Sequence, residues 1–139
     1  MPIPKKLQPH IDAAFPAHYL TMGTVLANGY AQITPRGSTQ VYDDNHLSTW
    51  ERGIGATAAE IHDDSKVTFY YSNFDLREQG MAVVRLYGRA KIHRSGPVYE
   101  RVWERLVEQE RRQDPEKKGF AVLVEIERVE DLRGNPITD

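Results

Sequence analysis

The sequence contains no cysteine. This absence excludes disulfides, thiolate nucleophiles, iron–sulfur clusters and zinc–thiolate sites, and it agrees with a reducing compartment. No apolar run approaches the roughly 20 residues needed to cross a bilayer, and the first residues, from Met1 to Pro9, lack the apolar stretch of a secretory signal. We therefore expect a cytoplasmic protein that has no membrane partner.

The chain also lacks a strong charge of either sign. Its 18 basic and 20 acidic residues give a net charge of −2, so we expect no nucleic acid partner. Glycine-rich dinucleotide fingerprints, phosphate-binding P-loops and serine-hydrolase elbows are missing. We expect no metal site, because metal-ligand spacing is absent from the histidines, which are His10, His18, His46, His62 and His93.

What remains is a chain of 139 residues, long enough for one domain with a real core. Prolines at positions 2, 4, 9 and 16 deny residues 1–17 a continuous helix or a central strand, so we expect an arm or a short helix there. The domain itself is predicted over residues 18–132. Residues 133–139 are predicted to be a surface tail.

Extended segments dominate the predicted domain. Asn28-Gly29 joins residues 18–27 to residues 30–34 in a hairpin, and a second pair is predicted at residues 38–42 and 46–50. Further strands are predicted at residues 66–72, 81–93 and 120–128, the middle one with one apolar and one mostly basic face. Six or seven antiparallel strands with one apolar face close most economically into a barrel or sandwich.

Helices are expected in two places. The alanine-rich residues 55–62 fit a short helix. A longer helix of about four turns is predicted to begin near Pro97 and to end before Pro115, with an apolar stripe that includes Val98, Val102 and Leu106.

Two turns carry the residue types that bind anions. Arg36, Gly37 and Ser38 follow the predicted first hairpin, where backbone N–H groups and a guanidinium can meet a phosphate or a polar ring edge. The second turn contains the residues Thr49, Trp50, Arg52 and Thr57, which lead into the start of the short helix beside an aromatic plane. Ordinary strand-end turns with solvated arginines are the alternative.

A third candidate is the basic face of residues 81–93. It carries Arg85, Tyr87, Arg89, Lys91 and His93. Such a stripe can hold a cofactor phosphate across a dimer interface, and Arg89 is our candidate for that role. The stripe could also follow a nucleic-acid backbone. A solvated sheet face or a subunit contact is the better explanation, because glutamates and aspartates elsewhere cancel its charge.

The order of these segments resembles the pyridoxamine 5′-phosphate oxidase-like family of FMN-binding split barrels over roughly residues 15–130. The similarity is carried by residues 20–35, by residues 42–67 with the glycine-bearing turn, and by Leu86-Tyr87-Gly88-Arg89-Ala90-Lys91-Ile92. The resemblance implies a mainly β, six- to seven-stranded antiparallel split barrel that forms a homodimer with cofactor sites at the subunit interface. Family members often carry lysine or arginine where this chain has Thr57.

The resemblance also implies roles for the site residues. Arg36, Gly37 and Ser38 would lie near the flavin ring, while Thr49, Arg52 and Thr57 would lie near the phosphate. We expect an FMN-dependent oxidoreductase acting on a small molecule, a relative of pyridoxamine phosphate oxidase and not that enzyme. The first alternative is a non-catalytic module that binds or senses a flavin, the deazaflavin F420 or haem. A small nucleic-acid-binding barrel ranks last.

Overall fold

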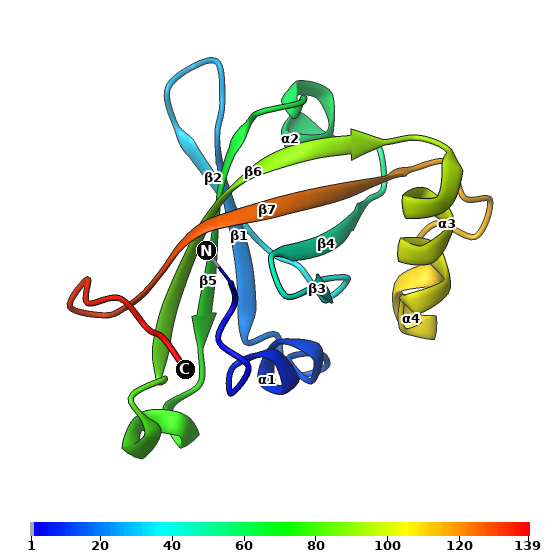
Figure 1. Cartoon of the computed structure of the whole chain (residues 1–139). Helices are drawn as coiled ribbons and strands as arrows, with labels where there is room; N and C mark the ends of the chain where they lie inside the picture. Colours follow the sequence, from blue (N-terminus) through cyan, green and yellow to red (C-terminus); the bar gives the residue numbers. More distant parts are fainter. Residues whose placement is uncertain (1) are drawn as a thin grey trace.

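Seven strands form a single antiparallel sheet in the computed structural model, which describes residues 2–139 (Figure 1). Across the sheet they run in the order β2-β1-β5-β6-β7-β4-β3, so that β2 and β3 are its two edges. The strands are β1 Leu20–Val25, β2 Ala31–Pro35, β3 Gln40–Asp43, β4 His46–Glu51, β5 Lys66–Ser72, β6 Val83–His93 and β7 Phe120–Asp131. This is the mainly β, antiparallel architecture that the sequence predicts, and it is consistent with a split barrel.

The helices are few and short. They are α1 Gln8–Asp12, α2 Gly55–Glu60, the 3-10 helix η1 Phe74–Gln79, α3 Gly96–Arg105 and α4 Glu108–Arg111. Within residues 2–139, none of them combines the length and the apolar character needed to cross a lipid bilayer.

Period-2 alternation decides which face of each strand enters the core. In β5 the side chains of Val67, Phe69 and Tyr71 are buried, at 2%, 0% and 1% exposure, while Lys66 and Tyr70 on the opposite face are exposed. The bounds of β5 coincide with the predicted strand because this alternation is unbroken. The inward faces of the strands enclose the main hydrophobic core.

The chain ends contribute more to this core than the sequence suggests. Ile3, Leu7 and Ile11 of the N-terminal segment are buried in the main cluster. Ile137 is also buried, and its backbone N–H donates to the carbonyl of Val129 over 3.0 Å. The expectation of a purely surface tail after residue 132 is therefore wrong at Ile137, because an apolar side chain fills space beside the main core.

The predicted long helix is also corrected. It is divided into α3 and α4 by an extended backbone at Leu106 and Val107, whose ψ angles are 141° and 152°. Leu106 is buried at 3% exposure in a second cluster that contains Trp50 and Val102. Tertiary burial of this side chain outweighs the helix propensity of the surrounding residues, and β-branched Val107 is a weak helix former.

Candidate functional site

A small cavity of about 120 Å³ lies between the edge strand β2, the end of β4 and the start of α2. Its lining consists of Gln32, Thr34, Arg36, Glu51, Arg52, Ile54, Gly55, Ala56 and Thr57. Of the predicted site residues, the structure brings Arg36, Arg52 and Thr57 together here.

The local backbone conformation brings the ends of β2 and β4 together. Pro35 ends β2 because it has no N–H to donate to a ladder, and the next residue, Arg36, donates its N–H to the carbonyl of Leu20 over 3.0 Å. Between β4 and α2 the chain turns through Gly53 and Gly55, whose φ angles of 85° and 89° lie in the left-handed region that favours glycine. These turns bring the residue after β2 beside the last residue of β4.

The centre of the cavity is an ion pair between Arg36 and Glu51. Arg36 Nη1 lies 2.9 Å from Glu51 Oε2, and the two side chains are 13% and 4% exposed. Within residues 2–139, two buried atoms of the pair make no directed hydrogen bond: Arg36 Nε and Glu51 Oε2. Since buried polar atoms nearly always have partners, this donor and this acceptor need an explanation, and hydrogen bonds to a ligand would supply one.

Thr57 has protein partners on its polar atoms. Its hydroxyl forms hydrogen bonds with the side-chain oxygen of Gln32 and, over 3.1 Å, with the hydroxyl of Thr24. Its backbone N–H donates to the same Gln32 oxygen over 3.1 Å. A phosphate at this residue would have to displace the Gln32 side chain.

Arg52 lies at the rim. Its side chain is exposed and donates from Nη1 to Gln113 Oε1 over 3.0 Å. This arginine can reach an anion only from the solvent side of the cavity.

Three other predicted site residues do not line the cavity and have structural contacts. Ser38 and Thr49 are buried and share a hydrogen bond of 2.7 Å. Trp50 is 3% exposed and donates from its indole nitrogen to Asp114 Oδ2 over 2.9 Å. Backbone N–H groups of Lys118 and Gly119 also donate to Asp114.

Gly37 lies under the ring of Phe15. A Cβ atom there would be 2.9 Å from that ring. The glycine is therefore explained by close packing with the N-terminal segment.

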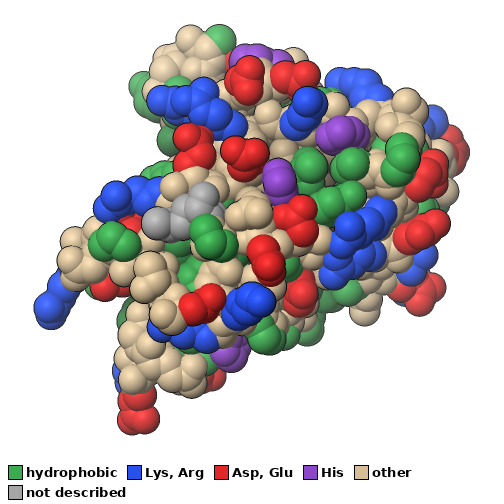
Figure 2. Space-filling model, viewed as in Figure 1, with side chains coloured by type: hydrophobic (Ala, Val, Ile, Leu, Met, Phe, Trp, Pro, Cys, Tyr) green, Lys and Arg blue, Asp and Glu red, His purple; other side chains and the backbone are tan. Residues whose placement is uncertain are grey.

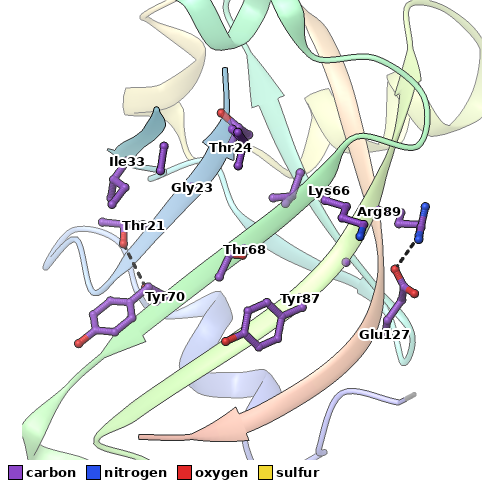
Figure 3. Close-up of a pocket in the computed structure, with 14 residues that line it drawn as sticks. Thr21, Gly23, Thr24, Ile33, Lys66, Thr68, Tyr70, Tyr87, Arg89 and Glu127 are labelled. Carbon is purple, nitrogen blue, oxygen red and sulfur yellow. Dashed lines mark hydrogen bonds and ion pairs between the residues drawn. The ribbon is translucent and has the colours of Figure 1, made fainter. Parts of the chain in front are cut away.

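Arg89, the last predicted site residue, lines a different feature. A groove of about 940 Å³ covers the outward face of the sheet over β1, β2, β5 and β6, and Glu127 of β7 also lines it. Arg89 lies at one end of it, paired with Glu127 over 2.9 Å. Figure 3 shows Lys66 near this end and Tyr70 and Tyr87 on the same side of the sheet.

Most of the surface of the groove is apolar. Its floor has short side chains and its walls have large ones. Gly23 and Thr68 are paired in the middle of the floor. Val25 and Ile33 stand beside them and are 72% and 70% exposed. Exposed apolar side chains that adjoin one another in this way are typical of an interaction surface.

A second charged cluster lies at the other end of the outward face. Glu130 accepts hydrogen bonds from the Tyr87 hydroxyl at 2.6 Å, Arg85 Nε at 2.9 Å and Arg128 Nε at 2.8 Å. The bond from Tyr87, followed by those from Arg128 and Arg85, lowers the pKa of Glu130 to about 2. Arg85 also donates to the carbonyls of Asp131 and Leu132, so the cluster holds the turn after β7.

Sequence reasoning missed Glu51 and Gln32. Glu51 ends β4, where residues 47–51 are all buried and no period-2 pattern marks an inward carboxylate. Gln32 lies in β2, where the alternation of residues predicts only the face of the strand on which its side chain lies. Neither residue carries a sequence signal of a site.

The lining suits a polar, uncharged group. Its polar side chains are the Arg36–Glu51 pair, Arg52, the amide of Gln32 and the hydroxyls of Thr34 and Thr57. Among the residues that line the cavity there is no histidine, lysine or tyrosine. On the face drawn in Figure 2, basic side chains lie among acidic ones, as the small net charge leads one to expect.

A family profile described as pyridoxamine 5′-phosphate oxidase matches residues 7–133. No curated protein matches the chain at a significant level.

Several solved structures resemble it. HupZ of Group A Streptococcus shares 22% identity over 99% of both chains, with a TM-score of 0.73. A putative pyridoxamine 5′-phosphate oxidase of Lactobacillus delbrueckii shares 24% identity over 92% of this chain and 93% of that one, with a TM-score of 0.66. An FMN-binding protein of Syntrophomonas wolfei shares 16% identity over 92% and 87%, with a TM-score of 0.64. At these identities the likeness is one of fold.

Proposed function

Since the chain belongs to the pyridoxamine 5′-phosphate oxidase family, we propose that it is a flavin-binding protein and that FMN is its first candidate cofactor. The observation that carries the proposal is the cavity at the end of β2. It joins Arg36, Arg52 and Thr57, and it holds a buried donor and a buried acceptor without directed partners. The proposed activity is oxidoreduction of a small molecule in the cytoplasm.

The residues present fit one edge of a flavin better than a phosphate. Arg36 Nε offers a hydrogen to a ring carbonyl and Glu51 Oε2 can accept one from a ring N–H. Gln32 and Thr34 offer polar atoms to a hydroxylated side chain. A bound flavin supplies hydride or electron transfer, and the chain supplies position, electrostatics and exclusion of water.

A second copy of the chain completes the proposed site. A cavity of about 120 Å³ is smaller than the roughly 300–1,000 Å³ of a ligand pocket, so one protomer covers only part of a flavin. β2 lines both this cavity and, on its other face, the apolar groove. Burying Val25 and Ile33 against a partner stabilises a homodimer by removing exposed apolar area from water.

A non-catalytic binding module is the second candidate. Its support is that Thr57 already has partners within the chain and that Glu51 is the one carboxyl group in the lining. One structural relative is an F420 reductase, with 15% identity and a TM-score of 0.54, which keeps a deazaflavin among the possible ligands. Haem suits this cavity less well, because none of its lining side chains is a usual iron ligand.

The proposal is tested by the visible absorption spectrum of the purified protein, taken as isolated and again after incubation with excess FMN and desalting. We expect a retained flavin spectrum at about one cofactor per chain. A protein that stays colourless after reconstitution contradicts the proposal. The dimer is tested separately by the molar mass of Ile33→Glu, which we expect to fall to that of a monomer while the fold is kept.

A further inference from the structure

Within residues 2–139, the buried pair at the cavity has one donor, Arg36 Nε, and one acceptor, Glu51 Oε2, that make no directed hydrogen bond, although Oε2 lies 2.9 Å from Arg36 Nη1. A guanidinium can only donate hydrogen bonds and a carboxylate can only accept them. We propose that Arg36 and Glu51 together recognise an uncharged imide edge, a carbonyl next to an N–H, and that this pair sets the ligand specificity of the site. The inference rests on the proposed flavin function and names the part of the ligand that the chain reads.

The charges of the pair argue against phosphate recognition by Arg36. Glu51 lies 2.9 Å from the guanidinium and offsets its charge before any ligand arrives. A phosphate beside Arg36 would therefore face a carboxylate that is 4% exposed, and like charges repel strongly where water is excluded. An imide carries no net charge. Its carbonyl can accept from Arg36 Nε and its N–H can donate to Glu51 Oε2, so neither side chain is repelled.

Two other predicted site residues in the lining already have partners within the chain. The hydroxyl and the backbone N–H of Thr57 are bonded to Gln32, and Arg52 is bonded to Gln113 at the exposed rim. The cavity of about 120 Å³ admits one edge of a planar ring and not a whole cofactor. Flavins and deazaflavins share the imide edge, so the pair would serve either ligand.

The test measures dissociation constants of the full chain for lumiflavin, which has the ring alone, and for lumiflavin methylated at N3, which lacks the N–H. We expect N3-methylation to weaken binding by about tenfold or more, since it removes the ligand's hydrogen bond to Glu51 Oε2 and leaves that buried oxygen with Arg36 Nη1 alone. In Glu51→Met, methylation should change the dissociation constant by less than about twofold, because the acceptor is gone. Glu104→Met, which alters an exposed glutamate on α3, should behave like the unaltered chain.

Every other outcome overturns a part of the proposal. Equal binding of both lumiflavins to the unaltered chain overturns the imide assignment and leaves flavin binding intact. A penalty of the same size in Glu51→Met shows that the methyl group is excluded elsewhere, which also overturns it. Binding of FMN without any binding of lumiflavin means that contacts to the phosphate provide the affinity, which overturns recognition of the ring edge by the pair. If neither FMN nor lumiflavin binds, the proposed function fails and the inference fails with it. Because the first comparison uses the unaltered chain, misfolding of a variant cannot hide the answer.

Discussion

Glu51 and Glu130 are both buried carboxylates that face arginine, at 3% and 7% exposure, but their surroundings differ. Glu130 accepts from three side chains, and its arginine partners also donate to backbone carbonyls. Among the residues that the structure describes, the Glu51 carboxylate has only Arg36 as a partner, and the pair keeps one donor and one acceptor without directed bonds.

The difference separates a structural cluster from a binding site. A fully satisfied polar network fixes one conformation, and here it ties β6 and β7 to the turn that follows them. An incompletely satisfied pair is costly to keep buried, so its presence needs an explanation. A ligand that completes its hydrogen bonds is the explanation that we propose for Arg36 and Glu51.

The largest effect is expected when the pair at the cavity is replaced as a whole. Arg36→Met/Glu51→Met removes both charges in similar volume, so we expect the melting temperature to stay the same or to rise. Flavin affinity should fall about 100-fold, because the donor and the acceptor are lost together. Thermal unfolding and a fluorescence titration with FMN check the two halves of this prediction. A large fall in the melting temperature with unchanged affinity would place Glu51 in the same class as Glu130.

The structural cluster should respond in the opposite way. Glu130→Gln puts an amide among three donors, so we expect the melting temperature to fall by about 5 °C or more while FMN affinity is unchanged. The matched control is Glu127→Gln, whose half-exposed carboxylate has Arg89 as its partner and should matter little. Equal melting temperatures of the two variants would contradict the structural role.

Lowering the pH should remove the stability that the Glu130 cluster contributes. The folded protein holds the pKa of Glu130 at about 2, below its ordinary value of 4.5, so folding favours the ionised form. Its contribution to stability is complete above pH 4.5 and is lost as the pH falls from 4.5 to 2. Melting temperatures of the unaltered chain and of Glu130→Gln should therefore converge over this range. A constant difference between them would count against this assignment.

The smallest effect is expected at the rim of the cavity. Arg52 is exposed and bonded to Gln113, so solvent screens its charge. We expect Arg52→Ala to weaken FMN binding by about threefold and riboflavin binding by less. Isothermal titration with both ligands checks this. A loss for FMN as large as that of the double variant would move the main recognition element from the pair to the rim.

Much of the fold follows from local sequence patterns. The alternation of residues 66–72 predicts β5 with its bounds, and Asn28-Gly29 marks the hairpin of β1 and β2. The break between α3 and α4 could not be predicted in this way. It depends on the burial of Leu106 beside Trp50, which is a contact between distant segments.

Only part of the candidate site could be predicted from local patterns. Arg36, Arg52 and Thr57 lie in turns whose residue types suggest anion binding, and the structure brings them together. The buried partner Glu51 could not be found from the sequence, because its pairing with Arg36 requires the chain after edge strand β2 to meet the end of β4. Trp50 illustrates the converse, since its aromatic side chain fills the second hydrophobic cluster.

The most direct test of the cavity as the flavin site is a titration of isotopically labelled protein with FMN, followed by the NMR shifts of the backbone amides. We expect the largest shifts in residues 32–36 and 51–57, which surround the Arg36–Glu51 pair. Shifts confined to the groove around Thr68, Tyr70 and Tyr87, or no shifts at all, would contradict the site proposed here.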